Sequence, residues 1–289
     1  MADAYHYDAT LVFKEDWKAT LQQELDEPVK WKDICNVEYS DYKIIHNPYL
    51  TDMTVRTLYR GTAYSMEAIT QTDEYTTINQ ARIAAQFKDR ADLAQFGYSS
   101  QMEVAKRQGI LLNEAIESAV LGAYGSMTDF GTEDLAGTAG GTTAITVSTT
   151  NIDDIVTFLI STIRTANGEG LLNQNGGFVV WRPADFQKLT TFMMANGFNV
   201  ADAALKNGAK QGVEYMGMTH YTSNLLTSGH VIAGIKKIIH LGILRSTFGQ
   251  VIITQDPGLN SGIGIISRVD YAVKVWTKTK AVVFDVNVA

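Results

Sequence analysis

The stretch "MEVAKRQGILLNEAIESAVLGAYG", residues 102–125, has the pattern of one long helix in a chain that otherwise favours strands and loops. Its small and apolar residues recur at steps of three and four, as one helical face requires. A helix over 101–124 is about 36 Å long, which exceeds the usual helix of about three turns. The recurring residues are Ala105, Leu112, Ala115, Ile116, Ala119, Val120 and Ala123.

Residues suited to both ends of a helix frame this stretch. Ser100 and Glu103 have the spacing of a capping box, which satisfies two backbone N–H groups at a helix start. Gly122 or Gly125 can end the helix in a left-handed conformation. The sequence therefore predicts a rod with defined ends.

The residues before this helix divide into two segments. Residues 1–50 are rich in aromatic side chains, with a short amphipathic helix expected at 14–26 and strand-like pieces at 37–42. Residues 51–87 are rich in Thr, Tyr, Val and Ile, which favour strands, and their alternation predicts a long hairpin. A two-stranded ribbon is marginal alone in water, so we expect another surface to support it.

The residues after the helix predict a second lobe and a return to strands. Residues 128–150 are rich in Gly and Thr and are expected to form a loop. Residues 151–235 have the alternating pattern of a compact α/β lobe, with helices at 152–166 and 183–195, a buried strand at 177–181, and strands within 212–224 and 229–235. Alternation in 268–275 and 282–288 predicts antiparallel strands with one covered face, and 255–262 is expected to form a turn.

Composition excludes several classes of protein. The chain has 289 residues, 45% of them apolar, and a net charge of -7, so neither a phosphate-gripping protein nor one held to an anionic membrane is expected. No stretch approaches the roughly 20 apolar residues needed to cross a bilayer, and no signal peptide is visible. Cys35 is the only cysteine, which excludes an intrachain disulfide, and it is expected to be a small buried apolar residue. These features predict cytosolic synthesis.

Motifs for catalysis or cofactor binding are weak. The five histidines lie far apart and lack metal-ligand spacing, although the segments around His220 and His230 could bring those two together. "GTAGGTT", residues 137–143, has the glycines of a phosphate loop but lacks its Lys-Ser/Thr pair. No GxSxG motif is present. We therefore expect no catalytic residue, no metal and no cofactor.

The order of these parts resembles a tailed-bacteriophage major capsid protein of the Hong Kong 97 type. Residues 78–125, 212–242 and 263–286 carry the resemblance. It implies an α+β fold with an N-terminal arm (1–50), an extended loop or E-loop (51–84), a peripheral domain with a long spine helix (85–135 and 236–289), and an inserted axial domain (136–235). No charged helical stretch of about a hundred residues precedes the arm, so a separate scaffolding protein is implied if one is needed.

The function that this resemblance implies is structural and not enzymatic. Such a protein assembles with itself into pentamers and hexamers of an icosahedral head that encloses double-stranded DNA without sequence-specific binding. The virion is its location, the host cytoplasm its place of synthesis, and portal, scaffolding and decoration proteins its further partners; no membrane is involved. The arm and the extended loop would contact neighbouring subunits, and the candidate contact residues are Phe13, Trp17, Trp31, Tyr59, Tyr64, Met66 and Tyr75.

Two alternatives remain open from the sequence. An encapsulin-like bacterial compartment would share the fold and would load protein cargo. A soluble α/β enzyme or ligand-binding protein would use the loop at 137–143 and would be a discrete monomer or dimer. Shell assembly predicts capsomers or particles of megadalton size on gel filtration.

Overall fold

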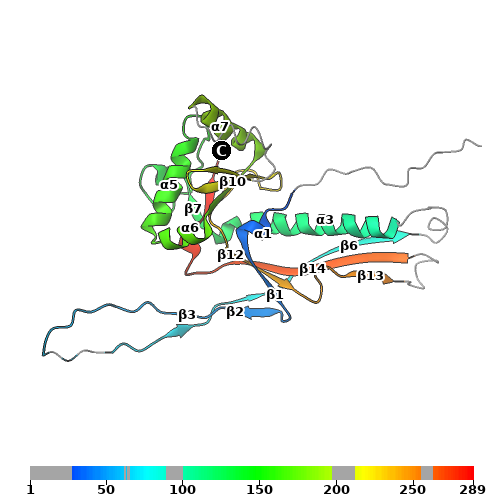
Figure 1. The fold of residues 1–289 in the computed structure, drawn as a ribbon, viewed down its shortest axis with the longest axis horizontal. Helices are drawn as coiled ribbons and strands as arrows, with labels where there is room; N and C mark the ends of the chain where they lie inside the picture. Colours follow the sequence, from blue (N-terminus) through cyan, green and yellow to red (C-terminus); the bar gives the residue numbers. More distant parts are fainter. Residues whose placement is uncertain (1–27, 62, 64–65, 89–99, 197–211, 255–262) are drawn as a thin grey trace, which may run out of the picture.

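The computed structural model describes residues 28–61, 63, 66–88, 100–196, 212–254 and 263–289. Figure 1 shows a long flat lobe built along helix α3, a rounder lobe that carries α5 and α7, and a hairpin that projects away from both. The predicted helix at 14–26 and the predicted turn at 255–262 lie outside the described residues. No described helix is long and apolar enough to span a membrane.

The flat lobe is built on a five-stranded sheet whose central strand is β14 (Ile263–Val275). One edge of β14 pairs antiparallel with β6 (Gln80–Lys88). Its other edge pairs antiparallel with two strands, with β13 (Val251–Thr254) along its first half and with β12 (Ile239–Leu244) along its second half. β1 (Cys35–Ser40) completes the sheet by pairing parallel with β12. The antiparallel pairing predicted for 268–275 is confirmed.

The predicted long helix is confirmed as α3 (Ser100–Leu121), which lies over β14 and β6. Gln108 on this helix is buried; its side-chain amide donates to the Ile265 carbonyl at 2.9 Å and accepts from Ser267 Oγ at 2.8 Å. Because a buried amide must satisfy its polar atoms, these two bonds help to fix the register of α3 on β14.

The ends of α3 differ from the sequence prediction. The helix continues directly into a 3-10 helix, η1 (Gly122–Ser126), and neither Gly122 nor Gly125 has a positive φ. The predicted left-handed ending is therefore wrong, because the chain tightens into a 3-10 turn instead. The predicted Ser100 cap concerns a side chain outside the described ones.

The rounder lobe is a six-stranded sheet with helices packed on it. Helices at 152–166 and 183–195 are confirmed as α5 (Ile152–Thr165) and α7 (Pro183–Ala195), and α6 (Glu169–Asn175) follows α5. The predicted strand at 177–181 is confirmed, and all five of its residues are buried. The strand order is β7 (Thr128–Phe130), β15 (Val283–Asn287), β11 (His230–Ile235), β8 (Gly177–Trp181), β10 (Met218–Thr222) and β9 (Val213–Tyr215).

The last strand lies in a different lobe from the one that the sequence suggested. β15 pairs antiparallel with β11 and parallel with β7, so it belongs to the rounder lobe and not with β14. It follows η2 (Lys280–Val282), and its first four residues are buried, so the prediction of one covered face is also wrong. The reason is that Asp285, a polar residue in the alternation, is itself buried and bonded to His230.

The expected loop at 128–150 contains regular structure. It includes β7 and a short helix, α4 (Thr132–Leu135). Asp134 is buried, and its carboxylate accepts hydrogen bonds from the backbone N–H groups of Gly131, Gly140 and Gly141 at 2.8–2.9 Å. The glycine-rich loop is therefore organised by the Asp134 carboxylate, to which its backbone N–H groups bond.

One continuous apolar core joins both lobes. The short helix α1 (Trp31–Ile34) enters this core, where the Trp31 side chain has no exposed surface. Part of the predicted N-terminal arm is thus built into the body, because α1 packs in the core and β1 pairs in the sheet. The prediction of an N-terminal arm over 1–50 is corrected for residues 31–40, which form α1 and β1 of the body.

The projecting hairpin consists of residues 43–78. Its paired part consists of β2 (Ile44–His46) with β5 (Tyr75–Thr77) and β3 (Tyr49–Leu50) with β4 (Gln71–Thr72), all antiparallel. The predicted strands around Val55 and Tyr59 are not formed, since the described residues between β3 and β4 have no strand. β6, expected to be part of the hairpin, pairs with β14 in the body.

Candidate functional site

The hairpin presents apolar side chains that its own chain leaves uncovered. We call residues 52–69 the tip. Large apolar residues of the tip are 69% to 98% exposed: Met53, Val55, Leu58, Tyr59, Met66 and Ile69. Exposed apolar side chains that are concentrated in one short segment indicate an interaction site in a folded protein. The support predicted for the hairpin is therefore present at its base and is missing along its described tip.

One carboxylate clamps the two sides of the tip together. Glu67 accepts a hydrogen bond from the Thr54 backbone N–H at 3.2 Å and pairs with Arg56 at 2.6 Å. The Thr54 amide, with help from Arg56, lowers the pKa of Glu67 from its ordinary value. This clamp shows that the tip has a preferred shape although its side chains face solvent.

The base of the hairpin is attached to the body by a second carboxylate. Glu74 lies between β4 and β5, and its carboxylate accepts hydrogen bonds from the Thr277 backbone N–H at 3.1 Å and from Thr277 Oγ1 at 3.0 Å. Lys274 Nζ, at the end of β14, lies 3.2 Å from the same carboxylate. Burial works against ionisation of Glu74, yet these bonds outweigh it, and the pKa of the carboxyl lies below its ordinary value.

A small apolar cluster lies beside this polar attachment. Ile45 and Ile78, which flank the base of the hairpin, pack against Leu244 and Ala272 of the five-stranded sheet. Gly242 allows this approach, because a Cβ atom there would lie 2.7 Å from Ile45 Cδ1. The cluster sits on the sheet face opposite α3, since Leu244 and Ala272 alternate with the core residues Ile243 and Tyr271.

Beyond this cluster, the same sheet face carries the Arg268–Asp270 ion pair and then a group of apolar residues that the described chain leaves uncovered. Ser267 bonds to α3, so the neighbouring Ile266 points to the opposite face, together with its cross-strand partners Ile252 and Ala85. Ile83 and Phe87 share this face and are 65% and 50% exposed. We call these five residues the bare face. The hairpin base covers one end of the sheet, and nothing in the described chain covers the other.

The start of the described chain is held by a buried carboxylate of α3. Glu117 is 1% exposed and accepts hydrogen bonds from the backbone N–H groups of Lys30 and Trp31 at 2.9 and 2.8 Å. A carboxylate at the N-terminus of a helix is favourable, although α1 is short. Glu117 thus holds Lys30 and Trp31, near the start of the described chain, against α3.

The seven predicted contact residues have different outcomes. Tyr59 and Met66 on the tip are 69% and 83% exposed, and Tyr75 at the base of the hairpin is 55% exposed, so all three remain candidates. Trp31 is fully buried in the core of its own chain, so its prediction as a contact with another subunit is wrong. Its aromatic neighbourhood in the sequence suggested a surface arm, but α1 folds inward. Phe13, Trp17 and Tyr64 lie outside the described residues.

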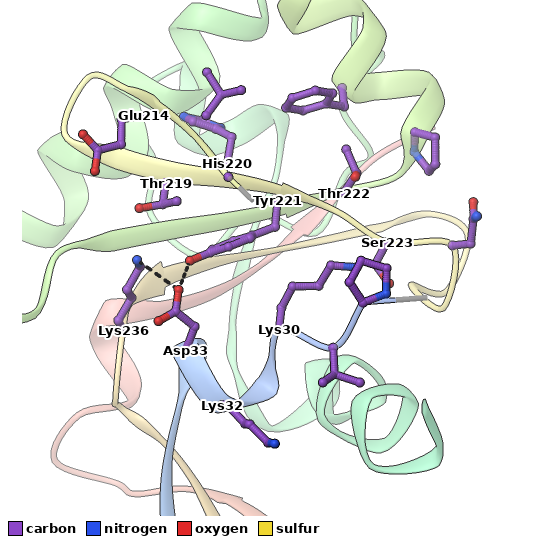
Figure 2. Close-up of a pocket in the computed structure, with 17 residues that line it drawn as sticks. Lys30, Lys32, Asp33, Glu214, Thr219, His220, Tyr221, Thr222, Ser223 and Lys236 are labelled. Carbon is purple, nitrogen blue, oxygen red and sulfur yellow. Dashed lines mark hydrogen bonds and ion pairs between the residues drawn. The ribbon is translucent and has the colours of Figure 1, made fainter. Parts of the chain in front are cut away.

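A cavity of about 900 Å³ lies between α1 and β10 (Figure 2). In its wall the Tyr221 hydroxyl donates to Asp33, which also pairs with Lys236 at 3.6 Å. The bond from Tyr221 and the charge of Lys236 lower the pKa of Asp33. These titratable groups satisfy one another, as structural groups do.

Two histidines of the rounder lobe are structural. His220 accepts a hydrogen bond from Trp181 Nε1 at 2.9 Å and lies 3.3 Å from the Tyr215 carbonyl, and burial lowers its pKa to about 4. His230 stacks on Tyr124 and bonds to Asp285 at 2.9 Å. No group of three metal-ligating side chains occurs among the residues that the structure describes.

The glycine-rich loop does not resemble a phosphate site. The backbone N–H groups of Gly140 and Gly141, which a phosphate would need, are already bonded to Asp134. The alternative of an enzyme that uses residues 137–143 therefore loses its structural basis. This role of Asp134 could have been suspected from the sequence, where the acid stands next to the glycine-rich run.

Comparison of the whole fold with solved structures gives a consistent result. The chain is similar to the capsid of a native GTA particle, with a TM-score of 0.72, 14% identity, and coverage of 100% of this chain and 99% of that one. It is also similar to a chain of Mycobacterium phage Che8, with a TM-score of 0.71, 18% identity, and coverage of 96% and 98%. A virus-like particle from Pyrococcus furiosus is similar at a TM-score of 0.56, 10% identity, and coverage of 90% and 92%.

Sequence comparison gives no match. No protein-family model matches the chain, and no curated protein matches it. The likeness thus lies in the fold, which is the fold of phage capsid proteins.

Proposed function

We propose that this chain is the major capsid protein of a tailed phage, which assembles with itself into pentamers and hexamers of an icosahedral head around double-stranded DNA. One observation carries the proposal: a chain with a capsid-protein fold projects a hairpin whose apolar tip has no cover within its own described residues. Exposed apolar surface of this kind marks a site of interaction with another protein. The protein is structural, and no enzymatic step is part of its role.

The bare face is our proposed receptor for a neighbour's hairpin. Its five residues are apolar and lie on one side of β6, β14 and β13, and the Arg268–Asp270 ion pair separates them from the small cluster under the hairpin base. Burial of apolar area contributes about 25 cal/mol per Å². Each contact can be weak, because a closed shell makes many of them at once.

The N-terminal segment is proposed to provide a second contact. Residues 1–27 precede the segment in which Glu117 holds Lys30 and Trp31, and their sequence contains the aromatic residues Phe13 and Trp17. Laid along another subunit, these side chains would add apolar contact area. Tyr59, Tyr64, Met66 and Tyr75 are the proposed contacts from the hairpin, and Trp31 is not among them.

Head-to-tail contacts of this kind close into rings when the rotation between subunits closes. The net charge of -7 suits a container whose inner wall does not grip packaged phosphate. Portal, scaffolding and decoration proteins are the further partners that such a head would have. The subunit would be made in the host cytoplasm and would reside in the virion.

A compartment shell that holds protein cargo is the second candidate. The observation in its favour is the fold likeness to the virus-like particle from Pyrococcus furiosus, although its TM-score of 0.56 lies below the 0.72 of the capsid of the native GTA particle. The contents of purified particles would separate the two candidates. A phage head is expected to hold DNA, whereas a compartment shell is expected to hold protein.

The hairpin tip can be tested by charge substitution. Val55→Asp combined with Met66→Asp places two carboxylates on side chains that are 98% and 83% exposed, so the folded monomer is expected to keep its melting temperature. Particles or capsomers should be lost, because the buried contact would then desolvate two charges. Size-exclusion chromatography with light scattering measures the mass.

The matched control is Asn173→Asp, which adds charge at an exposed position of α6 away from the hairpin. The control is expected to assemble like the unmodified chain. Assembly of the Val55/Met66 variant at an unchanged yield would contradict the proposal that the tip is a contact.

A further inference from the structure

The hairpin is joined to the body through very little apolar surface. Its base contributes Ile45 and Ile78 to a cluster of four buried residues, and the described tip contributes none. A two-stranded ribbon gains little stability alone, so packing gives it only a weak preference for one direction. The direction in which the hairpin leaves the body therefore needs another determinant.

Polar contacts at the base supply such a determinant. Glu74 connects the hairpin to the turn after β14 through Thr277 and Lys274, residues that are about 200 positions away in the sequence. Lys274 Nζ also donates to the Tyr75 carbonyl at 3.1 Å, and the Asn47 backbone N–H donates to the Glu74 carbonyl at 2.7 Å. Glu74 thus ties both strands of the hairpin to one rigid strand end.

We propose that Glu74 is the positioning residue that sets the angle of the hairpin relative to the body. The chain from Thr72 out to Gly61, if extended at about 3.3 Å per residue, reaches about 36 Å. A rotation of about 10° at the base would then move the tip by about 6 Å, more than one residue along a strand. A small change of angle at Glu74 therefore produces a large displacement of the tip.

The neighbouring carboxylates are less suited to this role. Asp73 is 53% exposed and pairs with His46, which lies on the same hairpin and so cannot orient it against the body. Asp52 does reach the body, at Lys278, but its side chain is 90% exposed, and exposed ion pairs contribute little. Glu74 is 14% exposed and accepts from a backbone N–H, a hydroxyl and an ammonium group.

The consequence for assembly rests on the proposed function. If the tip docks on a neighbour, the angle of the hairpin sets the angle between adjacent subunits and thereby the curvature of the shell. A variant without the Glu74 contacts would keep its contact surfaces but present them in the wrong direction. It is expected to give fewer particles or particles of mixed shape, with little change in melting temperature.

The angle can be measured on unassembled, full-length subunits by pulsed electron-spin distance measurement. Labels are attached at Val55→Cys, on the tip, and at Ser118→Cys, on the exposed side of α3. The native Cys35 is buried and will not take a label. Glu74→Gln is the test variant, because its amide N–H₂ would face the donors Lys274 and Thr277. Asp73→Asn is the matched control.

We expect one narrow distance distribution for the unmodified chain and for Asp73→Asn. For Glu74→Gln the mean should shift, or the distribution should broaden, by at least about 6 Å. Thr277→Val and Lys274→Met remove the groups of the body that bond to Glu74. These variants should also shift or broaden the distance distribution. An unchanged distribution in all three test variants would overturn the proposal.

The same samples separate this inference from the proposed function. Light scattering under assembly conditions reports whether particles form at all. An altered distance in Glu74→Gln, together with an unmodified chain that never assembles, would support the positioning role and contradict the capsid role. Particles from the unmodified chain, together with unaltered distances in the variants, would support the capsid role and contradict the positioning role of Glu74.

Discussion

At the scale of single residues, buried or half-buried carboxylates hold the segments that have the least apolar packing. Glu117 holds the start of α1, Asp134 organises the glycine-rich loop, and Glu74 ties down the hairpin base. Each accepts hydrogen bonds from backbone N–H groups. Bonds between a charged group and the backbone are among the stronger ones available to a chain, which suits them to segments without a core.

His220 gives a prediction for the dependence of stability on pH. Burial lowers its pKa to about 4 from an ordinary value of 6.5, so between these values the unfolded chain binds the proton and the folded chain does not. The contribution to stability is complete above pH 6.5 and is lost as the pH falls toward 4. It is on the order of 3 kcal/mol. Urea unfolding at pH 7, 5.5 and 4.5 measures it.

His220→Gln should flatten this part of the pH profile, because glutamine does not titrate. The matched control is Asn173→Gln, which changes no titratable group at an exposed position of α6 and should leave the slope unchanged. A slope in His220→Gln equal to that of the unmodified chain would show that burial of this imidazole does not govern the profile.

The sequence could not reveal most of these residues. Glu74 and Thr277 are 203 positions apart, and Glu117 and Trp31 are 86 positions apart, so neither pair has a local pattern. Trp31 was misjudged for a related reason: an aromatic residue close to a proline and several charged residues resembles a surface segment until its distant partner is known. Asp134 is the exception, because its partners lie within seven positions.

At the scale of elements, periodic patterns identified the helices correctly. α3, α5 and α7 match their predictions because an apolar face at 3.6-residue spacing needs no distant information. Strands were less well predicted. The alternation near Val55 and Tyr59 belongs to the exposed tip, and β15 joins a different sheet, because strand pairing depends on residues far away in the chain.

Gly109 gives a prediction about α3. It stands inside the helix beside a cavity of about 200 Å³ between α3 and the β13–β14 pair, and a Cβ atom there would meet nothing within 4 Å. Gly109→Ala should therefore raise the free energy of unfolding by about 1 kcal/mol. Chemical denaturation of the unassembled subunit measures the change.

Gly131→Ala is the contrasting variant. Its Cβ atom would lie 2.6 Å from the Thr143 carbonyl oxygen, so this substitution should lower stability. A loss of stability in Gly109→Ala would mean that the space beside the helix is filled in the folded subunit in solution.

At the scale of the whole molecule, the chain has a folded body and two apolar surfaces that its own described residues leave exposed. Its core joins both lobes, whereas the hairpin tip and the bare face expose apolar side chains to solvent. Both surfaces belong to a fold that is shared with phage capsids over nearly the full length of each chain. The two surfaces are complementary in chemistry, which is why we propose that they meet between subunits.

Electron microscopy of the purified full-length protein tests this central claim most directly. The account predicts closed shells, or rings of five and six subunits, with density for the hairpin of each subunit over the bare face of its neighbour. A field of single subunits at every concentration, each with its hairpin folded back against its own sheet, would contradict it.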